Sequence, residues 1–235
     1  MSGWNAKKFW SEAVAVEVNQ GFSVHLDGRT IKTPAKSAFV VPTMAMAQEI
    51  AAEWDAQEDQ VKPETMPFTR SANAAIDKVS IQHSEVADMI ADYGDSDLLC
   101  YRADSPRELC ERQAAAWDPY LNWADQTLNA RLQPRSGVMH QPQDPRAIEN
   151  LRRAVHAFSP FELTAIHDLV GISGSLVLGL AAAYEHESPE ALWDISRIDE
   201  RWQAEQWGDD EEALEVEAKK KSEFLHAAKF FALTK

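Results

Sequence analysis

The seven histidines are the residues best able to bind a metal ion or to move protons near neutral pH. They are scattered along the chain, and none stands in the H-E-x-x-H spacing of zinc hydrolases. His156 and His167 fall on adjacent predicted helices, where a polar or capping role is the ordinary interpretation. We therefore expect no metal site.

A serine-centred site is the next candidate, because Gly171-Ile-Ser-Gly-Ser175 comes close to the nucleophile elbow G-x-S-x-G. Ser175 stands where the final glycine should be, and no strand–helix–strand alternation surrounds the segment. We interpret Ser173 or Ser175 as the N-cap of an apolar helix over residues 176–183. The glycine patterns that hold nucleotide phosphates are absent, so the sequence predicts no cofactor.

The 38 acidic residues could hide a catalytic pair of carboxylates, because such pairs come together only in the fold. Nothing in their spacing singles out one pair. A hydrolase or transferase with an unrecognised carboxylate or histidine centre therefore stays as an alternative. A deep polar pocket lined by coupled titratable groups would favour it.

One segment combines aromatic and acidic side chains. Residues 189–207 are predicted to form a single helix, whose core-facing stripe comprises Leu192, Ile195, Ile198 and Trp202. Trp193, Glu200 and Trp207 follow one another at seven-residue intervals, so they would share another face, with Gln203 beside them. Either this face packs internally with Glu200 paired, or it presents a carboxylate between aromatic anchors to a partner.

Residues 199–217 contain nine acids and a single base, Arg201. One interpretation is a solvated helix start, because acids are favoured near a helix N-terminus. The other is a negatively charged patch that attracts a basic surface of a partner. The sequence leaves both open.

Composition excludes several partners. The formal net charge of −15 would repel nucleic acid and anionic lipid surfaces, and no apolar run approaches the ~20 residues of a membrane-spanning helix. Cys100 and Cys110 have neither metal-site spacing nor the density of a disulfide scaffold, which predicts reduced thiols. The start of the chain resembles neither an export signal nor a transit peptide, so we expect a bacterial cytoplasmic protein.

The elements that must position these residues change character along the chain. The first forty residues alternate as strands do, and Asp27-Gly28 predicts a tight hairpin turn. From Thr43 the apolar residues recur with helical spacing. The proline-containing segment 62–67 then interrupts the pattern. We predict an α+β fold, in which a small antiparallel β domain with one helix, residues 1–65, precedes an orthogonal helical bundle, residues 66–235.

Seven segments spread in order over nearly the whole chain resemble one family. They are Leu26-Asp-Gly-Arg-Thr-Ile-Lys-Thr-Pro34, Glu53-Trp-Asp-Ala-Gln57, Met66-Pro-Phe-Thr-Arg70, Asp97-Leu-Leu-Cys-Tyr-Arg-Ala103, Trp117-Asp-Pro119, Gly174-Ser-Leu-Val-Leu178, and Asp199-Glu-Arg-Trp-Gln203 through Trp207-Gly208. Together they resemble the α-subunit-specific assembly chaperones of the F-type ATP synthase, which occur in mitochondria and related bacteria.

The resemblance implies a binding protein that holds the unassembled α-subunit and prevents its aggregation, with no enzymatic activity, cofactor or small-molecule substrate. A scaffold protein that serves another complex is a further alternative, which only this resemblance separates from the chaperone. A eukaryotic member would act in the mitochondrial matrix. The family's sensitive acidic residue falls at Glu200, together with Asp199, and its sensitive tryptophan at Trp54. Because Trp54 also completes the apolar stripe of its own helix, we assign it to structure. The predicted partner-binding residues are Glu200, Asp199, Trp193, Trp207 and Gln203.

Overall fold

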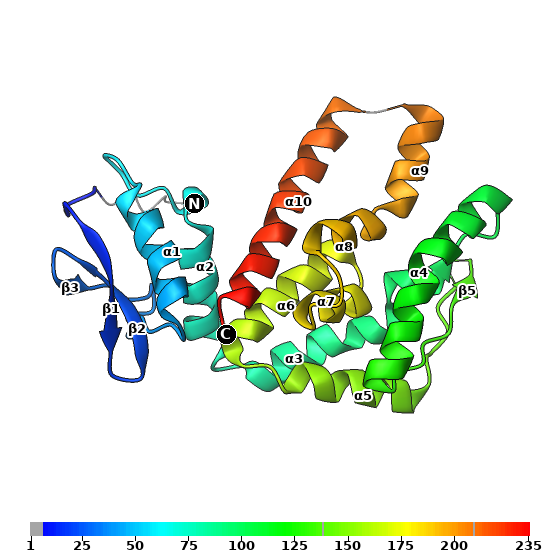
Figure 1. The fold of residues 1–235 in the computed structure, drawn as a ribbon, viewed down its shortest axis with the longest axis horizontal. Helices are drawn as coiled ribbons and strands as arrows, with labels where there is room; N and C mark the ends of the chain where they lie inside the picture. The colour runs from blue at the N-terminus through cyan, green and yellow to red at the C-terminus, as the bar shows by residue number, and fades with distance from the viewer. Residues whose placement is uncertain (1–6, 138, 209) are drawn as a thin grey trace. The chain divides into compact units, whose positions relative to one another are not determined.

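The computed structural model describes residues 7–137, 139–208 and 210–235, which fall into two compact units (Figure 1). Unit 1 comprises Met1–Gln82, Ser159–Ala165 and Lys229–Lys235, and unit 2 comprises His83–Phe158 and Ile166–Ala228. This division differs from the predicted domains, because segments far apart in the sequence pack into unit 1. The boundary at residue 65 stays a prediction about which part folds independently.

Unit 1 contains a three-stranded antiparallel sheet in the order β1 (Ala13–Val18), β2 (Gly21–Leu26), β3 (Arg29–Thr30). The hairpin turn between β2 and β3 is the predicted Asp27-Gly28, and both residues have positive φ angles. Beyond β3, Val41 forms an isolated antiparallel bridge with Phe22 of β2.

Helix α1 (Met44–Asp55) packs on β1 and β2, and it begins where predicted, because the Thr43 hydroxyl accepts the Met46 N–H. A 3₁₀ turn η1 (Pro63–Thr65) follows, then α2 (Pro67–Ala74) and a π-helical segment η2 (Ala75–Val79). The apolar side of α1 is buried, so the sheet and this helix form the core of unit 1.

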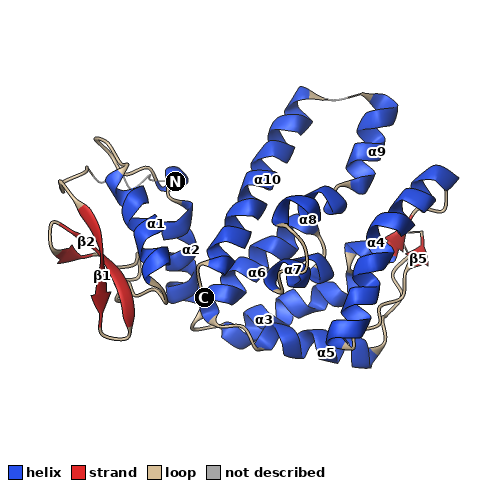
Figure 2. Ribbon diagram, in the orientation of Figure 1, coloured by secondary structure: helices blue, strands red, loops and turns tan. Residues whose placement is uncertain are grey.

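Helices make up most of unit 2, with two short parallel strands, β4 (Tyr101–Arg102) and β5 (Arg135–Ser136) (Figure 2). Its elements include α3 (His83–Ala91), η3 (Asp92–Ser96), η4 (Leu98–Cys100), α4 (Arg107–Leu128), α5 (Pro145–His156), α7 (Leu176–Ala183), α8 (Pro189–Ser196) and α9 (Ile198–Trp207). Helices α6 (Pro160–Ser173) and α10 (Glu211–Ala232) run through both units. The predicted small antiparallel sheet followed by a mostly helical chain is confirmed.

The core of unit 2 forms around α7, the apolar helix predicted from the sequence, which packs on α4 and α8. All of its residues are buried except Ala182. At Gly179 an added Cβ would lie 2.6 Å from the Val170 side chain of α6. Glycine is required there for the two helices to approach so closely.

Candidate protein-binding groove

The predicted helix over residues 189–207 is two helices, α8 and α9, because the backbone leaves helical geometry at Arg197 (φ −109°, ψ 22°). The Arg197 guanidinium is buried over the Trp193 ring, 4.9 Å from its centroid. It donates to Ser196 Oγ and pairs with Glu200 at 2.8 Å. These contacts hold the chain at the break, so side chains seven residues apart no longer share a face across it.

Trp193 therefore does not lie on a presented face with Glu200 and Trp207. Its side chain is only 1% exposed and packs 5.9 Å from the Phe224 ring of α10. The buried ring supports the Arg197 guanidinium from below. The helix break turns Trp193 into the core, and its predicted contact with a partner stays a prediction.

The sequence left open whether Glu200 is paired internally or presented to a partner, and the structure shows features of both. Its carboxylate is paired internally with Arg197, yet the residue is exposed. Asp199 behaves differently, because its carboxylate accepts a 2.6 Å hydrogen bond from the side-chain amide of Gln113, which is buried on α4. Asp199 thus anchors α9 to α4, whereas Glu200 remains open to a partner.

Two further contacts hold α9 on α4. Arg112 of α4 forms a 2.7 Å ion pair with Glu205, which lowers the pKa of the Glu205 carboxyl through the hydrogen bond. The same guanidinium lies 5.0 Å from the Trp202 ring centroid. The α4-facing side of α9 is therefore occupied, and its other side is available.

That available side of α9 faces α10 across a groove of about 410 Å³. Gln203, Ala204 and Trp207 line it from α9, and Ala213, Leu214 and Val216 line it from α10. Trp207 is 88% exposed, Val216 50% and Leu214 47%. Three large apolar side chains therefore lie open to solvent around one hollow, which is uncommon on a surface that has no partner.

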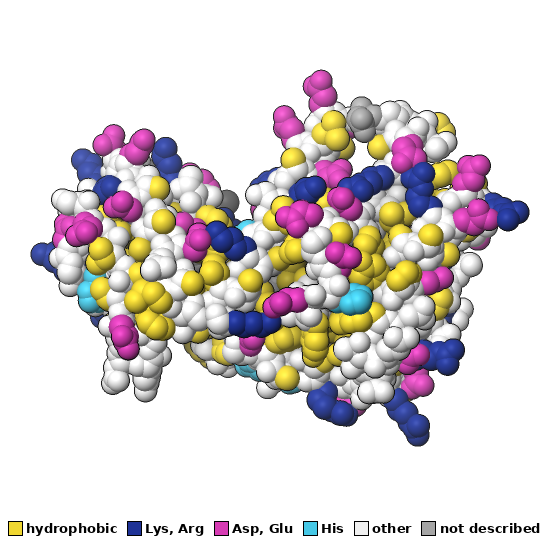
Figure 3. Space-filling view, viewed as in Figure 1, with side chains coloured by type: hydrophobic (Ala, Val, Ile, Leu, Met, Phe, Trp, Pro, Cys, Tyr) yellow, Lys and Arg dark blue, Asp and Glu magenta, His cyan; other side chains and the backbone are white. Residues whose placement is uncertain are grey.

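Carboxylates lie beside this apolar surface, and Figure 3 shows acidic side chains at the upper end of α10. Glu200, Asp210 and Glu217 line the groove with two bases, Arg197 and Lys220. Arg197 already forms an ion pair with Glu200. Asp210 also accepts the Glu212 N–H, so part of the acidic run does serve the start of α10. Asp209 lies outside the described residues.

Leu214 and Val216 were missed by the sequence reasoning, which treated the acidic run only as a charged patch. The signal was present, because these apolar residues interrupt the run of acids. A solvated helix start has no need of them. The sequence-predicted residues that the structure brings together in the groove are Glu200, Gln203 and Trp207.

The carboxyl of Asp97 has a different environment from the groove acids. It is buried between η4 and α7, where it accepts hydrogen bonds from the N–H groups of Leu99 and Val177 and from the Ser175 hydroxyl. Burial raises the pKa of Asp97 to about 6, although these hydrogen bonds oppose the rise. Two of the seven sequence segments thus meet here, and Asp97 caps the start of α7 together with Ser175.

Glu53 caps the start of α2. Its carboxylate accepts the N–H groups of Phe68 and Thr69 and the Thr69 hydroxyl, at 2.6 to 2.8 Å. Burial raises the pKa of Glu53, with the hydrogen bonds from Thr69 and Phe68 opposing the rise. The carboxyls whose pKa is raised are therefore caps of helices, and their partners are backbone amides and hydroxyls of the fold.

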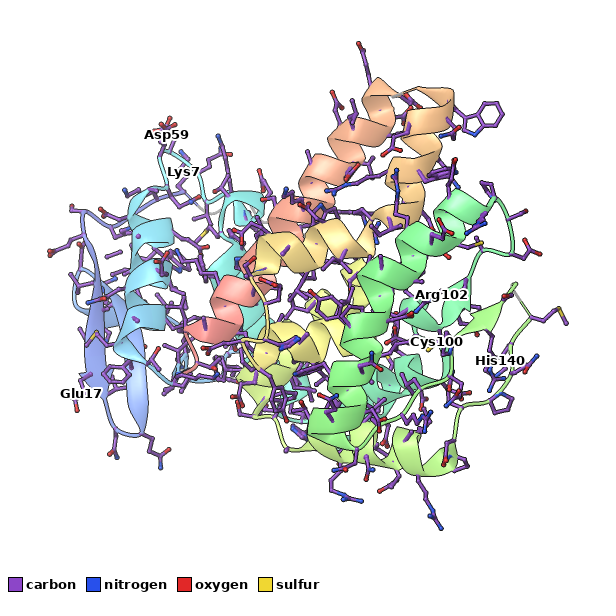
Figure 4. The ribbon with its side chains drawn as sticks, turned by 45° about the vertical axis from the view of Figure 1, so that its right-hand side comes forward. Lys7, Glu17, Asp59, Cys100, Arg102 and His140 are labelled. Atoms are coloured by element: carbon purple, nitrogen blue, oxygen red, sulfur yellow. The ribbon has the colours of Figure 1, made fainter. Side chains whose placement is uncertain are left out.

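A third pair of segments joins β4 to α4. Figure 4 shows Cys100 and Arg102 beside α4. Arg102 forms a 2.8 Å ion pair with Asp118 and lies 5.2 Å from the Trp117 ring centroid. Trp117 is fully buried and donates its indole N–H to the Ile195 carbonyl. Both cysteines are free, as predicted.

The two histidines on adjacent helices make separate local contacts. His156 lies 2.8 Å from Asp88, and His167 lies 2.9 Å from its neighbour Asp168, which raises the pKa of His167 through the hydrogen bond. Within residues 7–137, 139–208 and 210–235, no group of three His, Cys, Asp or Glu side chains could hold a metal ion. Within these same residues, no helix has both the length and the apolar character needed to cross a membrane.

Trp54 is half-buried near the end of α1, edge-on to Trp10 with 5.2 Å between ring centroids. The other members of its predicted apolar stripe, Ala47, Ile50 and Ala51, are buried. Its structural assignment stays a prediction, since part of the indole is open to solvent.

Known proteins resemble this chain over almost its full length. The family model described as ATP12 chaperone protein matches residues 7–125. The crystal structure of Atp12 from Paracoccus denitrificans is 44% identical, with a TM-score of 0.94, and the match covers 98% of this chain and 99% of that one. An aspartate-to-lysine mutant of the P. denitrificans protein is 43% identical, with a TM-score of 0.95 and 98% of both chains covered. The mitochondrial protein atp12 of Schizosaccharomyces pombe is 23% identical over 223 residues, which are 90% of this chain and 77% of that protein.

Proposed function

We propose that this chain, which belongs to the ATP12 chaperone family and is therefore an ATP synthase assembly chaperone, binds the unassembled α-subunit of the enzyme through the α9–α10 groove. It thereby prevents the α-subunit from aggregating before the catalytic head is assembled. The observation that carries this proposal is the groove itself, in which exposed Trp207, Leu214 and Val216 share one hollow with the carboxylates of Glu200, Asp210 and Glu217.

The chemistry of the groove defines the client surface that fits it. Exposed apolar side chains gain free energy when a partner buries them, roughly 25 cal/mol for each Å² removed from water. A carboxylate beside them favours a basic side chain on the partner and disfavours an acidic one. The expected client surface is therefore an apolar patch with Lys or Arg at its edge, of the kind that self-associates until a partner covers it.

Within the groove, Trp207 and Glu200 have separate tasks. Trp207 supplies a large, rigid apolar anchor, since almost all of its surface is available for burial. Glu200 lies close to the break at Arg197, and its ion pair there fixes the position of the carboxylate. A client arginine or lysine would meet a carboxylate that is already oriented. Gln203 lines the groove between them and adds a side-chain amide.

No catalytic step is part of this proposal, and the chain would transform no substrate. In support, Asp97 and Glu53, the two carboxyls whose raised pKa values are described above, cap helices and do not line the groove. Covering a surface needs no nucleotide. Release would follow when the β-subunit competes for the same surface of the α-subunit. The place of action would be the bacterial cytoplasm, or the mitochondrial matrix for a eukaryotic protein.

The test is capture of purified, unassembled α-subunit, measured by co-sedimentation and by the light scattering of aggregating α-subunit. Glu200→Lys should weaken capture about tenfold or more, because it replaces an attractive charge by a repulsive one. Glu17→Lys is the matched control, since Glu17 is exposed on β1 and the change in net charge is the same. Circular dichroism checks that both variants are folded.

Undiminished capture by folded Glu200→Lys protein would show that the groove is not the contact surface. If the unmodified chain leaves α-subunit aggregation unchanged and captures the isolated β-subunit instead, the client is wrong. Adding β-subunit to the preformed complex without nucleotide should displace the chaperone, and a complex that persists would contradict release by competition.

A further inference from the structure

Unit 1 contains a hollow of about 450 Å³ whose lining is mostly apolar. Its apolar side chains come from separate segments of the chain: Pro34, Trp54, Val61, Pro63 and Met66. Pro34, Trp54 and Met66 belong to three different segments of the family resemblance, and the fold brings them together around this one pocket. A volume of this size is sufficient for a bound ligand group.

The rim of the pocket is cationic. Arg70 and Lys78 both line it and are exposed, and no ion pair of either is found among the described residues. The lining carboxylate, Asp77, is already engaged by the Thr33 hydroxyl at 2.6 Å and by the Ala35 N–H at 3.0 Å. Burial alone would raise the pKa of Asp77, but hydrogen bonds from Thr33, Ala35 and Ser37 hold it below its usual value. Two cations are thus left available on a chain with a formal net charge of −15.

Two side chains of the lining also carry polar atoms without a hydrogen-bond partner in the described part of the chain. They are the indole N–H of Trp54, a donor, and the side-chain oxygen of Asn73, an acceptor, and both atoms are buried. An unpaired buried polar group costs free energy. A peptide group carries one C=O and one N–H, so it complements this pair, whereas a fatty acid or a simple anion offers no donor.

We propose that this pocket is a second client-binding site, which takes an extended polypeptide segment with a large apolar side chain next to a carboxylate. The proposal rests on the proposed function, because its occupant is a segment of a client polypeptide. The apolar side chain would enter between Trp54 and Met66, and the carboxylate would meet Arg70 and Lys78. The pocket and the groove are opposite in charge, so the chaperone would select two different kinds of segment.

Short labelled peptides test the pocket directly, without any ATP synthase subunit. One peptide carries phenylalanine between two aspartates, a second carries it between two lysines, and a third replaces the phenylalanine of the first by serine. The second peptide matches the acidic groove instead, so Glu200→Lys should weaken any binding of it. Fluorescence anisotropy with the full chain should show binding of the first peptide and none of the third. The double variant Arg70→Glu/Lys78→Glu should weaken that binding about tenfold, since two surface ion pairs are lost.

The matched control is Arg29→Glu/Lys32→Glu, which makes the same change in charge at exposed positions of unit 1 outside the pocket lining. It should leave the affinity within about twofold, because neither residue lines the pocket. Equal binding of the first peptide to both double variants would overturn the proposal, and so would equal binding of the first and third peptides to the unmodified chain.

Capture of the α-subunit separates this inference from the proposed function. If the first peptide binds and the unmodified chain captures no α-subunit, the pocket stands and the proposed client fails. If the α-subunit is captured equally by the chain and by Arg70→Glu/Lys78→Glu, and the first peptide does not bind, the second site fails and the function stands. The chain could also self-associate, and both Arg70→Glu/Lys78→Glu and Trp207→Ser could abolish that self-association. This result would identify the occupant as the acidic segment 199–217 of a second copy and would overturn the client proposal.

Discussion

Carboxylates have opposite roles in two regions of this molecule. Asp97 is fully buried and Glu53 is partly buried, and each carboxylate accepts several hydrogen bonds at the start of a helix. Around the α9–α10 groove the carboxylates are exposed and lie beside apolar side chains that are also exposed. The same chemical group therefore stabilises the fold in one place and is available to a partner in the other. Burial decides which role it takes.

The two regions also differ in how strongly tertiary contacts hold them. The Asp97 carboxylate accepts a hydrogen bond from the hydroxyl of Ser175, 78 residues further along the chain, and both residues are fully buried. Helix α9 has no fully buried residue, and a few polar contacts hold it to α4. Substitutions in the first region should therefore change stability, and those in the second should change binding.

Asp97→Ala should have the largest effect on stability. It leaves the N–H groups of Leu99 and Val177 and the Ser175 hydroxyl without their acceptor inside the core, and each such loss costs about 1–3 kcal/mol. Removing the desolvated carboxyl offsets part of this, so we expect the free energy of unfolding to fall by about 4 kcal/mol. Urea unfolding followed by circular dichroism measures it. A loss below about 1 kcal/mol would remove the distinction between the two regions.

The next largest effect should be the contribution of Asp97 to the pH dependence of the free energy of unfolding. Because burial raises its folded-state pKa from 3.8 to about 6, the folded chain keeps a proton that the unfolded chain has lost between about pH 4 and 6. This group therefore lowers the free energy of unfolding as the pH rises through that window, by up to about 3 kcal/mol.

Asp97→Asn isolates this contribution, because the amide does not ionise. We would measure the urea midpoints of both proteins between about pH 4 and 7. The midpoint should fall toward neutral pH less steeply for the variant than for the unmodified chain. The remaining slope belongs to other groups and is common to both proteins. Parallel curves would mean that Asp97 titrates as an ordinary surface carboxyl.

Trp207→Ser should have the smallest effect on stability, less than about 0.5 kcal/mol, because the side chain is almost fully exposed. Capture of the α-subunit should nevertheless fall about tenfold or more, as expected for an anchoring aromatic residue. Unfolding in urea and co-sedimentation with the α-subunit measure the two quantities on one preparation. A variant that unfolds more easily and still captures its client would reverse the assignment of roles.

Local chemistry in the sequence determined the elements of this protein. The Asp27-Gly28 turn, the Thr43 cap of α1 and the buried helix α7 follow from neighbouring residues, because turns, caps and apolar runs depend on residues a few positions apart. The sequence segments also sufficed to indicate the family, since residue order carries that resemblance without knowledge of the contacts.

Only the tertiary structure decided where single side chains point. A seven-residue spacing placed Trp193 beside Glu200 and Trp207, and the break at Arg197, held by contacts to Trp193 and Glu200, sent Trp193 into the core. The groove of unit 2 forms where two consecutive helices, α9 and α10, face each other, and the pocket of unit 1 is lined by segments separated in the sequence. The physical reason is that helical periodicity describes one continuous element, whereas burial depends on what packs against it.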